Sequence, residues 1–214
     1  MSYPNSPLPQ VKSAVILVDP FNDFLHPEGK LYGRVQESLV AADTVAHLRD
    51  LVNAAHAARI PIFYALHQSC ERGNFDGWRH LSPSAARGVG AFAIGSWGAE
   101  ILDGLEPDVP GNGDVVVSRH WNSSGFANTD LDYQLRQRDI THLVLAGMAA
   151  NTCLESTARY ARELGYHVTL LTDATAGFTT KAKDAATQLI WPLIAESVIT
   201  VEEWTSSLRP ISKV

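Results

Sequence analysis

The sequence predicts an α/β protein with a three-layer, doubly wound architecture: a mostly parallel six-stranded sheet with helices on both faces. Short continuous apolar segments, such as residues 15–18, 61–66 and 141–146, have the length and composition of strands buried on both faces. Longer segments with apolar residues at helical spacing alternate with these strands. This alternation is typical of parallel sheets built through right-handed crossovers. A chain of 214 residues is long enough to bury the core of one such domain.

The expected elements follow one another in a regular order. After the first strand, residues 38–58 carry an apolar face at helical spacing and are predicted to form one long helix before the second strand. Gly165 is expected at the C-terminal cap of a later helix. The remaining strands are expected at residues 114–117, 166–171 and 197–201, and the remaining helices at residues 130–137, 152–164 and 181–190.

Residues 67–113 differ from the rest of the chain. They are rich in Gly, Pro and Trp and have no sustained periodicity, which is typical of a functional loop. We expect this loop to be ordered, to contain a short helix near residues 99–105 and to set substrate specificity. Residues 1–11 are predicted to form a flexible arm, which leaves a single domain over residues 12–214.

Composition excludes several classes of function. The net charge of −6 argues against nucleic acid or an anionic membrane as the main partner. No apolar run approaches the roughly 18 residues of a membrane span, and the N-terminus lacks the pattern of a signal peptide. The two cysteines do not form a disulfide framework, so we expect a reduced, cytoplasmic protein.

Three residues with chemical potential follow predicted strands: Asp19, His120 and Cys153. The carboxyl ends of parallel strands meet at one edge of a sheet, where ligands bind. A carboxylate, a basic group and a thiol at that edge would make an activated nucleophile. The pattern Thr152-x-x-Glu155 is typical of a capping box, which would place Cys153 at a helix N-terminus and lower its thiol pKa. The alternative is that Cys153 is a small core residue.

The sequence also resembles the isochorismatase-like cysteine hydrolases, which include nicotinamidases, N-carbamoylsarcosine amidohydrolases and biuret hydrolases. The resemblance extends from about residue 15 to residue 200. Its landmarks are Asp19-Pro20-Phe21-Asn22-Asp23-Phe24, Ser124-Gly125-Phe126, Thr129-Asp130-Leu131, Gly147-x-x-x-Asn151-Thr152-Cys153 and Asp173-Ala174. The resemblance implies cofactor-independent hydrolysis of a C–N bond in a small amide, carbamoyl or lactam compound. It also implies a homodimer or homotetramer.

The resemblance implies roles for individual residues. Asp19 would be the general base and Cys153 the nucleophile that forms a thioester. The backbone N–H groups of Ala149 and Cys153 would form the oxyanion hole. The family has a cis peptide in this turn, which corresponds here to Met148–Ala149.

One position departs from the family pattern. The family's third catalytic residue is a lysine, and the matching position here is His120, with Arg119 beside it. Either His120 or Arg119 replaces the lysine, or the triad is broken and the domain only binds small molecules or acts as a scaffold. A histidine can supply a cation or a hydrogen-bond donor, although it is only partly charged at neutral pH.

The remaining expectations concern the pocket and metals. Phe24, Trp121, Phe126 and Met148 lie beside the landmarks and are expected to form walls of a largely apolar pocket. Nicotinamidases of this family bind a metal in the region that corresponds to His67 and His80. The segment Ala65-Leu66-His67 lacks the aspartate of their Asp-x-His pair, so neither a metal nor another cofactor is expected.

Overall fold

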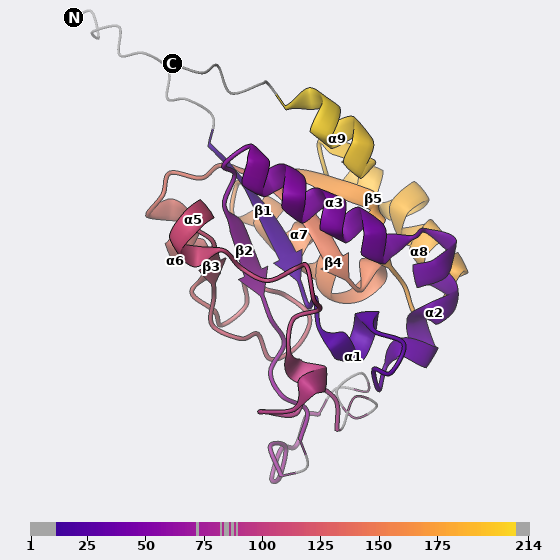
Figure 1. Cartoon of the computed structure of the whole chain (residues 1–214). Helices are drawn as coiled ribbons and strands as arrows, with labels where there is room; N and C mark the ends of the chain where they lie inside the picture. The colour runs from indigo at the N-terminus through magenta and orange to yellow at the C-terminus, as the bar shows by residue number, and fades with distance from the viewer. Residues whose placement is uncertain are drawn as a thin grey trace, which may run out of the picture.

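The computed structural model describes residues 12–208, except residues 72, 82, 84, 85, 87 and 89, so the predicted arm at residues 1–11 lies outside the described residues. The predicted fold class is confirmed. Six strands form one all-parallel sheet in the order β3-β2-β1-β4-β5-β6 (Figure 1). The strands are β1 Ser13–Val18, β2 Ile62–Ala65, β3 Val115–Val116, β4 His142–Met148, β5 His167–Ala176 and β6 Ser197–Ile199.

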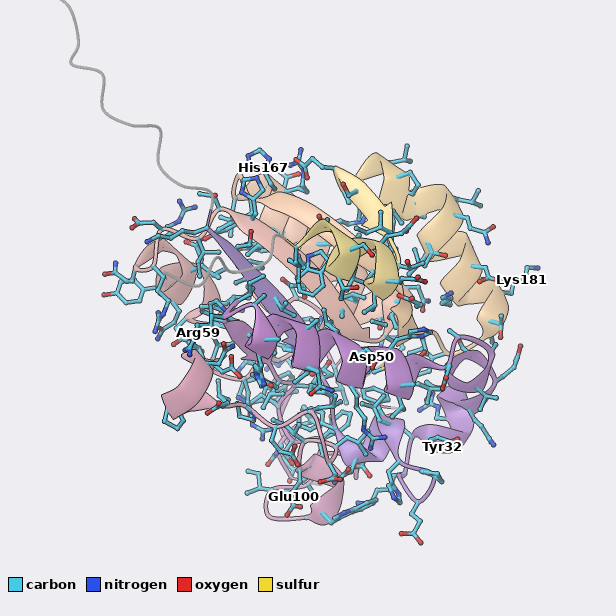
Figure 2. All side chains as sticks on the ribbon, turned by 45° about the horizontal axis from the view of Figure 1, so that its top comes forward. Tyr32, Asp50, Arg59, Glu100, His167 and Lys181 are labelled. Carbon is cyan, nitrogen blue, oxygen red and sulfur yellow. The ribbon has the colours of Figure 1, made fainter. Side chains whose placement is uncertain are left out.

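Helices cover both faces of this sheet. One face packs against α1 Asn22–Leu25, α2 Tyr32–Ala41, α3 Thr44–Ala57 and α9 Val201–Ser207. The other packs against α6 Leu131–Arg136, α7 Glu155–Glu163 and the helical turns that follow α8 Thr180–Ala185. Figure 1 shows α3 crossing in front of the sheet and α7 behind it. Charged residues such as Asp50 on α3 and Lys181 on α8 are exposed on the solvent side (Figure 2).

The central strand β1 shows why apolar runs form this sheet. Val15 and Leu17 point into one hydrophobic core, whereas Ala14, Ile16 and Val18 point into the other. Successive side chains of a strand face opposite sides, so a strand covered on both faces must be apolar throughout. No described helix is long and apolar enough to cross a membrane.

Two predicted helices are wrong. The single helix expected over residues 38–58 is instead two helices, α2 and α3, separated by a turn in which Asp43 has a left-handed φ of 46°. The buried hydroxyl of Thr44 donates to the backbone oxygen of Thr175 at 3.0 Å, which anchors the start of α3 to β5. The helix expected near residues 99–105 does not form; this region contains only the 3₁₀ turn η1 Trp97–Ala99, followed later by α5 Val109–Asn112.

The sheet topology determines where a site can lie. β1 pairs with β2 on one side and with β4 on the other, and the later strands are added outward in opposite directions from these neighbours. In parallel sheets, ligands bind beyond the carboxyl ends of the strands at such a switch in strand order. Gly147 passes so close to β1 that an added Cβ would lie 2.1 Å from the backbone oxygen of Val18.

Gly165 has a φ of +90° directly after α7, which confirms the predicted C-terminal cap.

Candidate active site

Asp19, His120 and Cys153 converge beyond the carboxyl ends of the central strands, as the sequence predicts. Asp19 follows β1, is 1% exposed and has a left-handed φ of 50°. Its backbone N–H donates to the oxygen of Ala65 at the end of β2, at 3.0 Å. Its carboxylate oxygen Oδ1 accepts a hydrogen bond from the backbone N–H of His67 at 2.7 Å and lies 3.2 Å from Nε2 of His120.

His120 is held in place by both its backbone and its ring. Its backbone N–H donates to Leu66 and its backbone oxygen accepts from Gln68, each at 2.9 Å. The ring places Nε2 at 3.2 Å from Asp19 and Nδ1 at 2.9 Å from the backbone oxygen of Asn122. A carboxylate and a carbonyl can only accept hydrogen bonds, so both ring nitrogens must carry hydrogen. This geometry favours the imidazolium form of His120.

The environment of His120 supports the charged form. Burial of the ring disfavours the charge, but the negative charge of Asp19 and the hydrogen bonds to Asp19 and Asn122 outweigh this effect, and the pKa of His120 is raised. The pKa of His67 is lowered instead, because burial and the nearby charges of His120 and Arg119 outweigh the charge of Asp19, which raises it.

Arg119 points elsewhere. Its guanidinium donates to the backbone oxygen of His67 at 2.8 Å and lies 5.5 Å from the ring centroid of Phe21. Burial lowers the pKa of Arg119, and the charge of Asp19 counteracts this. Of the two candidates for the position of the family lysine, His120 is therefore the one whose side chain contacts Asp19.

Cys153 lies in a π-helical turn, η2 Ala150–Leu154, that connects β4 to α7. The expected capping box at Thr152 and Glu155 does not form, because the helical turn already begins at Ala150. The oxygen of Ala149 instead accepts the backbone N–H groups of Thr152 and Leu154 at 3.0 and 3.2 Å. The peptide between Met148 and Ala149 is cis, as the resemblance implied.

The pKa of Cys153 is raised, contrary to the prediction from the helix N-terminus. Burial of the thiol and the negative charge of Asp19 raise this pKa well above its ordinary value. Hydrogen bonds from the Thr152 hydroxyl and the Ala149 backbone N–H lower it by less. Burial and a facing carboxylate outweigh the helix terminus, so the resting side chain is a thiol that needs a base.

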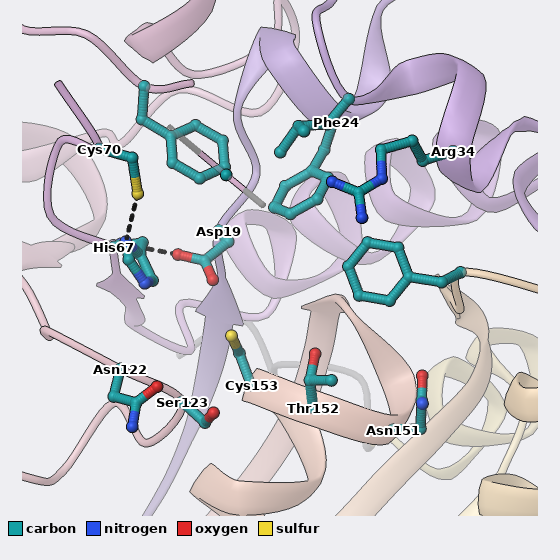
Figure 3. A pocket seen from close by; sticks show the side chains of 14 residues that line it. Asp19, Phe24, Arg34, His67, Cys70, Asn122, Ser123, Asn151, Thr152 and Cys153 are labelled. Carbon is teal, nitrogen blue, oxygen red and sulfur yellow. Dashed lines mark hydrogen bonds between the residues drawn. The ribbon is translucent and has the colours of Figure 1, made fainter. Parts of the chain in front are cut away.

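A cavity of about 380 Å³ opens above these residues (Figure 3). Phe24 lines it, as predicted. Cys70 is 2% exposed and also lines the cavity, with its sulfur 3.9 Å from Nδ1 of His67. The described residues that line it are Asp19, Phe24, Leu31, Arg34, His67, Cys70, Gly88, Phe92, Asn122, Ser123, Asn151, Thr152, Cys153 and Phe178.

Three predicted walls, Trp121, Phe126 and Met148, are not among these lining residues. Trp121 is 41% exposed and its ring lies 5.5 Å from that of Trp78. Phe126 is buried against Tyr160, with stacked rings 5.9 Å apart. Met148 is buried in the core on the other face of the sheet from Phe126. Proximity in sequence to the landmarks does not decide which way a side chain points.

Several lining residues are not predicted from the sequence, most clearly Arg34, Phe92 and Phe178. Arg34 lies on α2, whereas Phe178 follows β5. No local pattern marks these positions, because only the packing of distant segments brings them to the cavity. In the described part of the chain, no three His, Cys, Asp or Glu side chains converge in a way that could hold a metal ion. His80 is exposed and does not line the cavity.

Comparisons with known proteins agree with this geometry. The family model of the isochorismatase domain matches residues 13–203. The ureidoacrylate amidohydrolase RutB of Caulobacter segnis is 32% identical over 181 residues, which covers 79% of this chain and 74% of that protein. The uncharacterized isochorismatase family protein YwoC of Bacillus subtilis is 44% identical over 88 residues, so the match spans only 41% of this chain and 46% of that protein.

A solved structure shows the same fold over nearly the full length. The cysteine hydrolase from Pseudomonas syringae pv. phaseolicola superposes with a TM-score of 0.75 at 29% identity, covering 96% of this chain and 97% of that chain. The family model, the fold and the converging Asp19 and Cys153 therefore all support one conclusion: this chain belongs to the isochorismatase-like cysteine hydrolase family.

Proposed function

We propose that the protein is a cysteine-dependent hydrolase that cleaves a C–N bond in a small amide, carbamoyl or lactam compound. The observation that carries this proposal is the position of Asp19, whose carboxylate lies 3.2 Å from Nε2 of His120 and lines the same cavity as Cys153. Relatives of the chain are amidohydrolases, which supports the same class of reaction.

The first step needs a base, because the raised pKa of Cys153 keeps it as a thiol. Asp19 accepts the thiol proton, and the thiolate attacks the carbonyl carbon of the substrate. The imidazolium of His120 orients Asp19 and offsets the negative charge that moves from the carboxylate to the sulfur. The charge of His120 is therefore part of the proposed mechanism.

The next steps pass through an oxyanion. The backbone N–H groups of Ala149 and Cys153 are proposed to hold it. Collapse of the tetrahedral intermediate breaks the C–N bond, and the departing amine takes the proton from Asp19. A thioester remains on Cys153. Asp19 then accepts a proton from water, which hydrolyses the thioester and releases the thiol.

The second candidate function is a catalytically silent domain that binds small molecules or acts as a scaffold. It is motivated by the histidine at the position of the family lysine. The hydrogen bonds of His120 favour the enzyme, because they hold a positive charge against Asp19. The two functions differ in one observable: only the hydrolase forms an acyl group on Cys153.

The experiment is a screen of nicotinamide, biuret, carbamoyl amino acids, maleamate, ureidoacrylate and lactams, followed by ammonia release and by mass. Cys153→Ala and Asp19→Asn should abolish turnover, and rapid quenching should reveal an acyl mass on Cys153 in the wild type. Absence of turnover on every compound, together with no acyl mass, would establish the silent domain.

Alkylation by iodoacetamide tests the role of Asp19, with Cys70 as the internal reference. If Asp19 is the base, Asp19→Asn should slow the labelling of Cys153 while Cys70 still reacts slowly. If Asp19 only raises the thiol pKa, its removal should speed the labelling of Cys153. Faster labelling in Asp19→Asn would therefore contradict the proposed base.

A further inference from the structure

We propose that the substrate carries a carboxylate at the end remote from its scissile carbonyl, and that Arg34 binds this carboxylate. The inference rests on the proposed hydrolase function, because it places the scissile carbonyl at Cys153. Arg34 lies on α2 and lines the cavity that holds Asp19 and Cys153. It therefore belongs to the substrate cavity without being part of the reaction centre.

The cavity has two chemically different sides. Asp19, His67 and Cys153 form the reacting side, where an imidazolium already balances the carboxylate. Figure 3 shows Arg34 on the opposite side of Asp19 from His67, with its guanidinium extending towards the cavity. The apolar side chains of Phe24, Leu31 and Phe178 also line the cavity. Among the described lining residues, Arg34 alone carries a permanent positive charge.

The orientation of Arg34 suits a carboxylate. The guanidinium carbon lies over the ring of Phe178, 5.4 Å from its centroid, which is a cation–π contact. A guanidinium carries five N–H donors in one plane and can pair with a carboxylate through two parallel hydrogen bonds. The contact with Phe178 also restricts the rotation of a long side chain, which reduces the entropy lost on binding.

Charge also decides which way round an anionic substrate would bind. A second carboxylate beside Asp19 would be repelled, whereas the same group beside Arg34 is attracted. The two interactions favour a single orientation, with the carboxylate at Arg34 and the amide at Cys153. The protein as a whole carries a net charge of −6, so a local cation is needed to attract an anionic ligand to this cavity. The volume of about 380 Å³ suits a small molecule.

A matched pair of amides tests the inference. Succinamate and butyramide share an acyl chain and differ in whether a carboxylate or a methyl group ends it. In Arg34→Gln, the ratio of kcat/KM for succinamate to kcat/KM for butyramide should fall about tenfold or more, which is the usual scale for losing a charged hydrogen-bond pair. Arg34→Lys should show a smaller fall, because it retains the charge but not the planar fork.

The matched control is Arg59→Gln. Arg59 is an exposed cation after α3, before β2, and so lies at the amino edge of the sheet, away from the cavity (Figure 2). This substitution removes the same charge from the whole protein, and the ratio should stay at the wild-type value. Added salt should weaken the wild-type preference for succinamate, because Arg34 is exposed at the cavity mouth.

A binding measurement separates this inference from the hydrolase proposal. Calorimetry of succinate with Cys153→Ala needs no turnover, and binding should be at least about tenfold weaker when Arg34→Gln is added. Arg34-dependent binding without turnover of any amide would support the carboxylate site and refute the hydrolase. The inference on Arg34 is overturned if succinate binds equally with and without Arg34, if it does not bind at all, or if the succinamate ratio is unchanged in Arg34→Gln.

Discussion

Replacing His120 by glutamine or by lysine separates the charge of this side chain from its hydrogen bond to Asp19. Glutamine can still donate to the carboxylate but is neutral, whereas lysine restores the charged residue of the family. Because the ring is 1% exposed and lies 3.2 Å from Asp19, its charge acts in a site with little solvent screening. We expect His120→Gln and His120→Ala to lower kcat/KM by about 10² to 10³, the usual cost of one electrostatic donor. His120→Lys should lose less.

The pH dependence gives the sharper readout. The pKa of His120 is raised above its ordinary value of 6.5. The imidazolium is therefore fully present at pH values below 6.5 and is lost as the pH rises through the higher pKa of the folded state. The stabilisation from its pair with Asp19 is likewise complete below the unfolded-state pKa and disappears over the same alkaline range. kcat/KM should therefore fall on the alkaline side, and this limb should move to higher pH in His120→Lys, since lysine ionises near pH ~10.4.

The assay is kcat/KM against pH for the best amide of the screen, with thermal unfolding of each variant as the control for folding. Breaking a buried ion pair costs about 3–5 kcal/mol of stability, so the alanine variant must be measured below its unfolding temperature. Wild-type activity in His120→Gln would refute the role of the charge. An alkaline limb that stays in place in His120→Lys would show that another group titrates there.

Further predictions concern the structural support of the site. Gly98→Ala should destabilise the protein by about 1–3 kcal/mol, because the added Cβ would lie 2.3 Å from the carboxylate of Asp23. Gly33→Ala, which has no heavy atom within 4 Å of the new Cβ and lies in α2, should instead stabilise it by about 0.5–1 kcal/mol; denaturant titration measures both. Thr157→Val should cost about 1–3 kcal/mol, because the Thr157 hydroxyl accepts from the backbone N–H of Gly125 and donates to the backbone oxygen of Cys153; unchanged stability would show that these hydrogen bonds are dispensable.

Much of the fold follows from local patterns. The apolar run of β1 and the alternation of strands with amphipathic segments predict the parallel sheet, because a strand covered on both faces must be apolar throughout. The single helix expected over residues 38–58 is wrong for a reason that no periodicity contains. The break at Asp43 depends on the contact of Thr44 with β5, more than a hundred residues later in the chain. The expected homodimer or homotetramer stays a prediction.

The sequence by itself determined which reactive side chains the candidate site contains and at which edge of the sheet they lie. Asp19, His120 and Cys153 each follow a strand, and the ends of parallel strands meet in space. Only the tertiary structure decided how these groups behave. The pKa of His120 is raised because the charge of Asp19 and two hydrogen-bond acceptors flank its ring, and the pKa of Cys153 is raised because burial and Asp19 outweigh its helix terminus. Burial and charge act through space and leave no local pattern in the sequence, and the packing of α2 that brings Arg34 to the cavity leaves none either.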